Sequence, residues 1–135
     1  MAVALLALAG SCKKSSDNGG NGSNANAAFI GTYYGTLVTN GTYTSSDTII
    51  ITAGSNGSAI VMTSSTSAGS KYTINATVSG NSISMSSQSV YVPSYGYNFT
   101  VTGSGILSSP SLQVNMQFVS PSSVTATLVF NGTKQ

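Results

Sequence analysis

Residues 71–78 read Lys-Tyr-Thr-Ile-Asn-Ala-Thr-Val, and every second side chain in this stretch is apolar. A period of two is typical of a β-strand with one buried side and one solvent-facing side. The same alternation recurs in residues 97–102, 112–118 and 124–130, whereas residues 49–51 are three consecutive isoleucines. Beyond Phe29, no stretch combines helical spacing of apolar residues with capping residues. The sequence therefore predicts an all-β domain.

Turn-forming dipeptides separate the alternating runs. Asn40-Gly41 and Asn56-Gly57 are typical of two-residue hairpin loops, because both positions tolerate positive φ, and Gly80-Asn81 separates two runs in the same way. Because the connections are short, we expect neighbouring strands to pair in an antiparallel up-and-down meander. A Greek-key sandwich would need a long crossover, for which residues 87–96 are the one candidate. The eight predicted strands are 30–39, 42–53, 58–64, 71–79, 81–86, 97–107, 111–119 and 123–131.

Charged residues are scarce, at 4% of the 135 residues, where an ordinary soluble domain has about 25%. The 26 serines and 16 threonines supply the polarity instead. Open sheets protect their edges with charged side chains, above all lysine, and this chain has few of them. Closing eight strands into a barrel removes the edges. We therefore predict a closed, lipocalin-like barrel, with a β-sandwich as the alternative.

The N-terminus has the features of a bacterial export signal. Residues 2–9 form an apolar run that is too short to span a bilayer and is followed by small residues. Residues 8–12 (Leu-Ala-Gly-Ser-Cys) resemble the lipobox of bacterial lipoproteins, and the Ser-Cys-Lys-Lys junction is similar to that of Bacteroidota lipoproteins. The resemblance implies a signal peptide at residues 1–11 and a lipid, palmitate among its acyl chains, on Cys12. The alternative is a lone buried cysteine, and because no basic segment precedes Ala2 we expect the true start upstream.

Residues 13–28 are rich in Gly, Ser and Asn, which predicts a flexible tether between Cys12 and a domain at residues 29–135. Two or three acyl chains hold a protein stably at a bilayer. We therefore expect a cell-envelope protein whose partner is the outer membrane, on either its periplasmic face or the cell surface. The net charge of +2 is too small to indicate a nucleic-acid partner, and we expect a monomer.

The predicted meander resembles the lipocalin or calycin family of β-barrels. Gly31-Thr32-Tyr33 opens the first predicted strand, where that family carries a Gly-x-Trp motif, so Tyr33 stands in place of the tryptophan. The family also packs an arginine of its last strand over this ring, and the chain has no arginine. The resemblance implies a similar barrel architecture.

Groups for catalysis are few. Within residues 29–135 the titratable side chains are Asp47, Lys71, Lys134 and tyrosines. There is no histidine to activate a serine and no pair of carboxylates for glycoside hydrolysis, and a Ser–Lys arrangement with Lys71 is the remaining formal option. We expect no enzyme, no cofactor and no metal site.

The candidate binding segment is residues 91–97, Tyr-Val-Pro-Ser-Tyr-Gly-Tyr. At a barrel mouth, Tyr91, Tyr95 and Tyr97 could stack on a glycan or a small apolar ligand, and the alternative is a turn whose tyrosines pack on the sheet. The corresponding functions are a ligand-binding envelope lipoprotein, or a structural or adhesive surface lipoprotein with a filled core. Separately, Asp47-Thr48-Ile49 resembles the O-glycosylation site of exported Bacteroidota proteins, which implies Thr48 as the acceptor.

Overall fold

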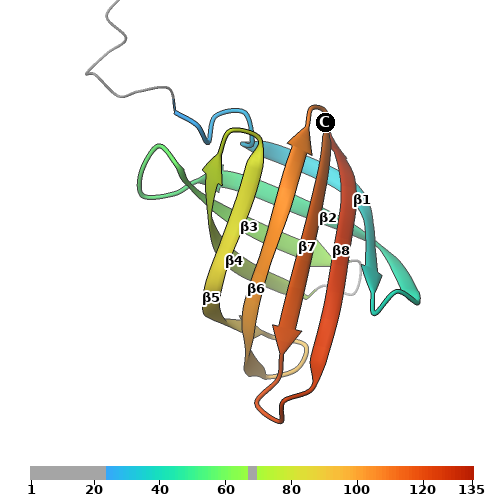
Figure 1. Ribbon diagram of the computed structural model, residues 1–135. Coiled ribbons are helices and arrows are strands. Elements are labelled where there is room, and N and C mark those ends of the chain that lie inside the picture. Colours follow the sequence, from blue (N-terminus) through green and yellow to red (C-terminus); the bar gives the residue numbers. More distant parts are fainter. Residues whose placement is uncertain (1–23, 67–69) are drawn as a thin grey trace, which may run out of the picture.

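The structure is a computed structural model that describes residues 24–66 and 70–135, and these residues form a closed antiparallel barrel (Figure 1). Each strand pairs with the next, and the last pairs with the first. This confirms the predicted closed eight-stranded meander over the sandwich alternative. The strands are β1 (Gly31–Thr39), β2 (Tyr43–Ala53), β3 (Ala59–Thr66), β4 (Lys71–Ser79), β5 (Ser82–Val92), β6 (Tyr97–Ser108), β7 (Ser111–Val119) and β8 (Thr125–Lys134).

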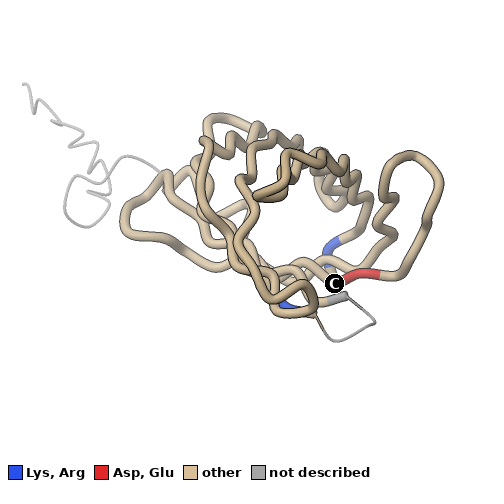
Figure 2. The backbone as a smooth tube through the Cα atoms, turned by 90° about the horizontal axis from the view of Figure 1, so that it is seen from below, with Lys and Arg blue, Asp and Glu red and all other residues tan. Residues whose placement is uncertain are grey.

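The predicted alternation sorts the side chains between the interior and the outside of the barrel. Along β4, Tyr72, Ile74, Ala76 and Val78 are buried while their neighbours are exposed, and β7 repeats the pattern. Uncharged polar residues (Ser, Thr, Asn and Gln) occupy most of the outward positions of these two strands. Figure 2 looks along the barrel and shows how few of the described positions carry a charge. Polarity without charge therefore covers the outside, and apolar packing fills much of the inside.

The main departure from the expected strands is β5, which continues to Val92 instead of ending at residue 86. Ile83 and Met85 are buried at odd positions, but Val90 and Val92 are buried at even positions. A β-bulge between Met85 and Gln88 shifts the register. Such a shift exchanges the inward and outward positions, so the alternation breaks and the segment looks like a loop. The sequence prediction that β5 ends at residue 86 was therefore wrong, and residues 87–96, the candidate crossover of the sandwich alternative, instead hold the second half of β5 and a short turn to β6.

The barrel end at which the described chain begins is covered by residues 24–30. Phe29 is fully buried there, and its carbonyl accepts a hydrogen bond of 2.9 Å from Tyr33 Oη. Asn26 Nδ2 donates to the carbonyls of Asn56 and Ala59, at 3.2 and 2.9 Å. Figure 1 shows this segment in blue at the same end as the C-terminus. The turns β1–β2, β5–β6 and β7–β8 lie at the opposite end, which we call the mouth.

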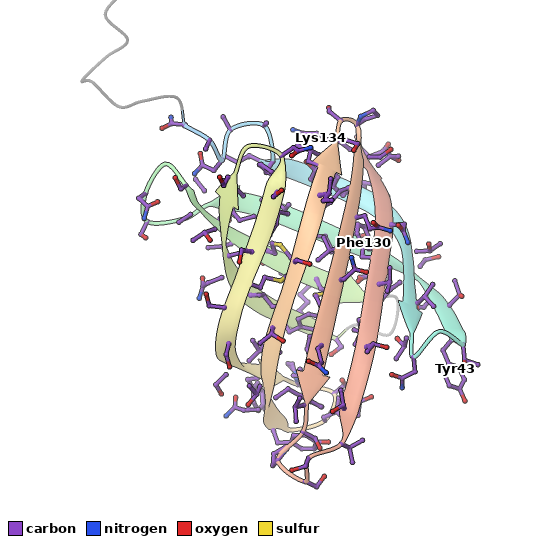
Figure 3. The ribbon with its side chains drawn as sticks, in the orientation of Figure 1. Tyr43, Phe130 and Lys134 are labelled. Carbon is purple, nitrogen blue, oxygen red and sulfur yellow. The ribbon has the colours of Figure 1, made fainter. Side chains whose placement is uncertain are left out.

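Lys134 of β8 lies at the covered end of the barrel (Figure 3), where it packs against Tyr33. Its Nζ lies 6.0 Å from the ring centroid and donates to the Ala28 carbonyl at 3.2 Å. A cation over an aromatic ring is attracted by the ring's π-electrons, so this contact helps to hold the end of β8 against β1. The sequence did not indicate this pair, because the last strand was expected to end at residue 131.

The lipidation site and most of the tether lie outside the described residues, so the prediction for Cys12 stays a prediction. Within the described part of the chain, no helix is long and apolar enough to cross a membrane.

Candidate ligand-binding site

A pocket of about 590 Å³ opens at the mouth of the barrel. Its lining comes from seven of the eight strands, all but β3, and from the β1–β2, β5–β6 and β7–β8 turns. The volume falls within the range of small-molecule sites, about 300–1,000 Å³. A second hollow of about 610 Å³ lies on the outer wall, between Tyr34 of β1, Ile106 of β6 and the strands between them. The mouth pocket is the stronger candidate, because it reaches buried aromatic side chains inside the barrel.

Five aromatic rings line the mouth pocket and touch one another in sequence. Tyr95 and Tyr97 each contact Phe99, with ring centroids 5.3 and 4.9 Å apart. Phe99 contacts Phe118 at 5.8 Å, and Phe118 contacts Tyr72 edge-to-face at 5.3 Å. The exposed fraction falls from 63% at Tyr95 to 6% at Tyr72. We call these five residues the aromatic chain, and it gives the pocket a continuous aromatic wall from rim to floor.

The β5–β6 turn positions the outer rings of the aromatic chain. The backbone N–H groups of Tyr95 and Gly96 both donate to the Val92 carbonyl at 3.0 Å. Gly96 has a φ of 73°, a left-handed conformation that glycine adopts without steric cost. This tight turn lets Tyr95 cover the mouth while Tyr97 begins β6.

Hydroxyl groups surround the aromatic chain at the rim. Ser70 Oγ donates to Ser94 Oγ at 3.0 Å, and the hydroxyls of Ser120 and Ser122 are also 3.0 Å apart. Ser120 Oγ in addition accepts a hydrogen bond of 3.1 Å from the Val124 N–H. Because a hydroxyl both donates and accepts, this rim suits the polar groups of a ligand whose apolar part lies on the rings.

A buried polar cluster lies at the inner end of the aromatic chain. Ser64 Oγ donates to Asp47 Oδ2 at 2.7 Å, and the Thr48 N–H donates to Asp47 Oδ1 at 2.8 Å. Asp47 is 3% exposed, and burial raises the pKa of its carboxyl group, which the hydrogen bonds partly offset. Burial also raises the pKa of Tyr72 to about 12, and the neighbouring Asp47 charge acts in the same direction.

Tyr72 connects the polar cluster to the pocket. Its ring lines the pocket, and its neighbour across the β3–β4 pair is Ser64. Tyr72 Oη is buried close to this polar cluster, and Ser64 acts on the pKa of Tyr72 in the opposite direction from burial. The hydroxyl oxygen itself is closed off from the pocket, so Tyr72 meets the pocket through its ring.

The residues singled out in the sequence reach different places. Tyr95 and Tyr97 line the pocket, whereas Tyr91 points away from the interior and is 55% exposed. Thr48 is half-buried in the middle of β2, beside the buried Asp47. Lys71 is exposed at the start of β4. No cluster of three or more His, Cys, Asp or Glu side chains occurs within residues 24–66 and 70–135.

Sequence reasoning missed the inner half of the site. Phe99 and Phe118 were expected as inward residues, but nothing in the alternation indicated that Phe118 of β7 meets Tyr72 of β4 across the barrel interior. Asp47 was counted only as a charge, although it stands two and four residues before Ile49 and Ile51, which both point inward. That spacing was a usable signal, but the run of three isoleucines at residues 49–51 obscured which side of the strand was buried.

No protein-family model matches the chain, and no curated protein matches it. Among solved structures, a redesigned β barrel superposes with a TM-score of 0.60 at 19% identity, covering 84% of this chain and 96% of its own. A second redesigned β barrel, mFAP1 bound to DFHBI, has a TM-score of 0.63 at 18% identity, covering 83% of this chain and 100% of its own.

A natural protein is also similar. A Bacteroides fragilis protein described as a "putative outer membrane protein" has a TM-score of 0.60 at 17% identity. The match covers 84% of this chain and 47% of that chain, so this protein spans about half the length of its neighbour. At these identities the likenesses establish a shared barrel fold.

Proposed function

We propose that this protein is a lipid-anchored cell-envelope protein whose barrel binds a small ligand with an aromatic or apolar face in the mouth pocket. The observation that carries the proposal is the aromatic chain, because it lines a pocket of about 590 Å³ that opens to solvent. A purely structural barrel would gain stability by filling this volume with side chains. The alternative of a completely filled core is therefore less well supported.

The position of the pocket is consistent with an anchor at Cys12. The described chain begins at the covered end of the barrel, where residues 24–30 pack, and the mouth lies at the opposite end (Figure 1). A tether attached at the covered end would direct the mouth away from the lipid surface. The ligand would then enter from the aqueous side, not from within the bilayer.

The neighbouring structures agree with both parts of the proposal without deciding either. The redesigned barrel mFAP1 was solved bound to DFHBI, so a barrel of this fold accommodates a ligand. The Bacteroides fragilis neighbour is described as an outer membrane protein candidate, which favours an envelope location. We further propose binding without catalysis, since Lys71 faces solvent on the side of β4 opposite Tyr72 and does not meet a pocket serine.

A pocket-filling variant tests ligand binding. Leu128 lines the pocket, whereas Val129 points to the other face of β8. We expect the fluorescent dye Nile red, a neutral aromatic probe, to bind the wild-type barrel, and Leu128→Trp to weaken its binding at least tenfold. Val129→Trp is the matched control and should bind as the wild type does. Equal binding by all three proteins would place the dye outside the pocket and contradict the proposal.

Two further measurements address the ligand class and the anchor. Calorimetric titration with neutral disaccharides asks whether the rim hydroxyls select a glycan, and Tyr95→Ala should weaken any such binding while Tyr91→Ala should not. For the anchor, palmitate labelling of cells that express the full chain should disappear in Cys12→Ala. Label retained by that variant would refute lipidation at Cys12.

A further inference from the structure

The hollow of about 610 Å³ on the outer wall of the barrel shares no described lining residue with the mouth pocket. It spans four strands that lie side by side, in the order β1, β8, β7 and β6 (Figure 1). Tyr34 of β1 stands at one side and Ile106 of β6 at the other, and these side chains are 53% and 50% exposed. We call this second site the outer-wall hollow, and its walls are open to a ligand from solvent.

A first row of side chains explains why the outer wall is hollowed here. Cross-strand neighbours continue from one strand to the next in the order Tyr34, Thr133, Ser111 and Ser108. All four are exposed. One large ring therefore stands beside three short side chains that carry hydroxyl groups. Neighbouring strands lie about 4.8 Å apart, so this row extends about 14 Å along the wall.

A second row supplies amide groups. Ile106 pairs with Gln113, and Gln113 pairs with Asn131. Gln113 Nε2 donates to Asn131 Oδ1 at 3.1 Å, and both side chains are exposed. This bond holds the two amides next to each other. A side-chain amide has more donor and acceptor sites than one such bond uses, so Gln113 Oε1 can accept from a ligand and Asn131 Nδ2 can donate to it.

The outer-wall hollow combines separated apolar side chains with an uncharged polar floor. None of its described lining residues is charged, so an ionic ligand would find no counter-ion among them. An apolar ligand would cover the amides and hydroxyls without giving them partners, which is unfavourable. A sugar ring has C–H groups on its faces, which pack on an aromatic ring, and hydroxyls around its edge, which both donate and accept. The lining therefore matches a neutral sugar best.

We propose that the outer-wall hollow binds a short neutral oligosaccharide. One sugar ring packs on Tyr34, and its hydroxyls bond Gln113 and Asn131. The oligosaccharide continues over the short side chains of the first row toward Ile106. Because the aromatic chain takes no part in these contacts, this site is independent of the ligand proposed for the mouth pocket.

An NMR titration of the nitrogen-15-labelled full chain tests binding and location together. The probes are maltotriose, cellotriose and mannotriose, three neutral trisaccharides that differ in linkage or in sugar. We expect at least one of them to shift the side-chain amide signals of Gln113 and Asn131 in a saturable way. If none of the three shifts these signals, the proposal is wrong.

Variants on the outer wall test the contacts. Tyr34→Ala removes the stacking ring and Gln113→Ala removes one amide of the pair, so each should weaken trisaccharide binding about tenfold. Gln117→Ala is the control for Gln113, because Gln117 lies on the same face of β7 and does not line the hollow. Tyr91→Ala is the control for Tyr34, because Tyr91 is 55% exposed on β5. Unchanged affinity in Tyr34→Ala would overturn the proposal.

Variants at the mouth separate this site from the proposed function. Leu128→Trp and Tyr95→Ala alter the mouth pocket and should leave trisaccharide binding unchanged. Loss of binding in either variant would place the sugar in the mouth and contradict the outer-wall site. If Nile red does not bind but trisaccharide binding depends on Tyr34, the outer-wall site is supported and the mouth proposal fails.

Sedimentation of the wild-type protein tests the competing occupant, a second copy of the chain. We expect no self-association that depends on Tyr34. A dimer that Tyr34→Ala dissociates would show that the outer-wall hollow is an interface between copies, and would overturn the assignment to an oligosaccharide.

Discussion

Closure of the barrel between β1 and β8 depends on a glycine whose side-chain space is already occupied by backbone. Gly35 faces Gly132 across this pair. A Cβ at Gly35 would lie 2.0 Å from the carbonyl oxygen of Asn131 and 2.5 Å from the Cα of Gly132. Ordinary van der Waals contact begins at about 3.4 Å, so Gly35→Ala must push the two strands apart by more than an ångström. Backbone atoms cannot rotate away as the end of a side chain can.

The size of the effect follows from what this separation breaks. Overpacking costs about 1–3 kcal/mol, and each ladder hydrogen bond lost costs about 1 kcal/mol net. With two such bonds weakened, we expect Gly35→Ala to lower the free energy of unfolding by about 3–5 kcal/mol, a large share of the roughly 5–15 kcal/mol of a typical domain. Urea denaturation followed by tyrosine fluorescence and far-UV circular dichroism measures it.

A second glycine provides the matched control. Gly41 lies in the β1–β2 turn with a φ of 68°, and a Cβ there would meet nothing within 4 Å. Gly41→Ala should therefore cost only the strain of a left-handed alanine, about 1–2 kcal/mol. If Gly35→Ala proves no more destabilising than Gly41→Ala, then close approach of the strands is not what Gly35 provides, and the reasoning is wrong.

Three further predictions concern the ends and the interior of the barrel. Burial raises the pKa of Asp47 above its ordinary 3.8, so the folded state holds the carboxyl proton more tightly than the unfolded state does. The free energy of unfolding should therefore be highest below pH 3.8 and fall as the pH rises to the folded-state pKa, by at most about 1.4 kcal/mol per pH unit. Urea denaturation over a pH series should show this decrease in the wild type and not in Asp47→Asn. Phe29→Ala empties a fully buried site at the covered end and should cost about 3–5 kcal/mol, with faster hydrogen exchange at residues 24–30; unchanged exchange there would show that Phe29 does not hold that segment. Lys134→Ala removes the cation over the Tyr33 ring and should cost about 1 kcal/mol in thermal melts, against less than about 0.5 kcal/mol for the exposed Lys71→Ala.

The fold was predictable because strand structure and turn chemistry are local properties. Alternation in residues 71–78 and 112–118 indicates which side of each strand is buried, and dipeptides such as Asn40-Gly41 indicate where a hairpin turns. Closure of the sheet into a barrel could also be predicted, because a chain with so few charged residues has few side chains that could protect an open sheet edge. The prediction failed at the β-bulge between Met85 and Gln88. The bulge exchanges the inward and outward positions of β5, so the second half of this strand does not continue the alternation of the first half.

The candidate site was predictable only at its rim. Tyr95 and Tyr97 belong to a conspicuous segment, whereas the inner end of the aromatic chain is a contact between Phe118 of β7 and Tyr72 of β4, which are distant in the chain. Which inward side chains meet depends on strand register and on the curvature of the closed sheet, and neither is written in the alternation of a single strand.

By itself the sequence determined an all-β chain, its eight strands and their closure into a barrel, because these follow from residue periodicity, turn residues and the scarcity of charge. Residues 8–12 also resemble a lipobox, and the anchor at Cys12 that this resemblance implies stays a prediction. The tertiary structure alone decided that one end of the barrel is covered and the other open, that Asp47 lies inside, and that Lys134 covers Tyr33. Each of these depends on contacts between residues far apart in sequence, whose distances are set only when the eighth strand pairs with the first.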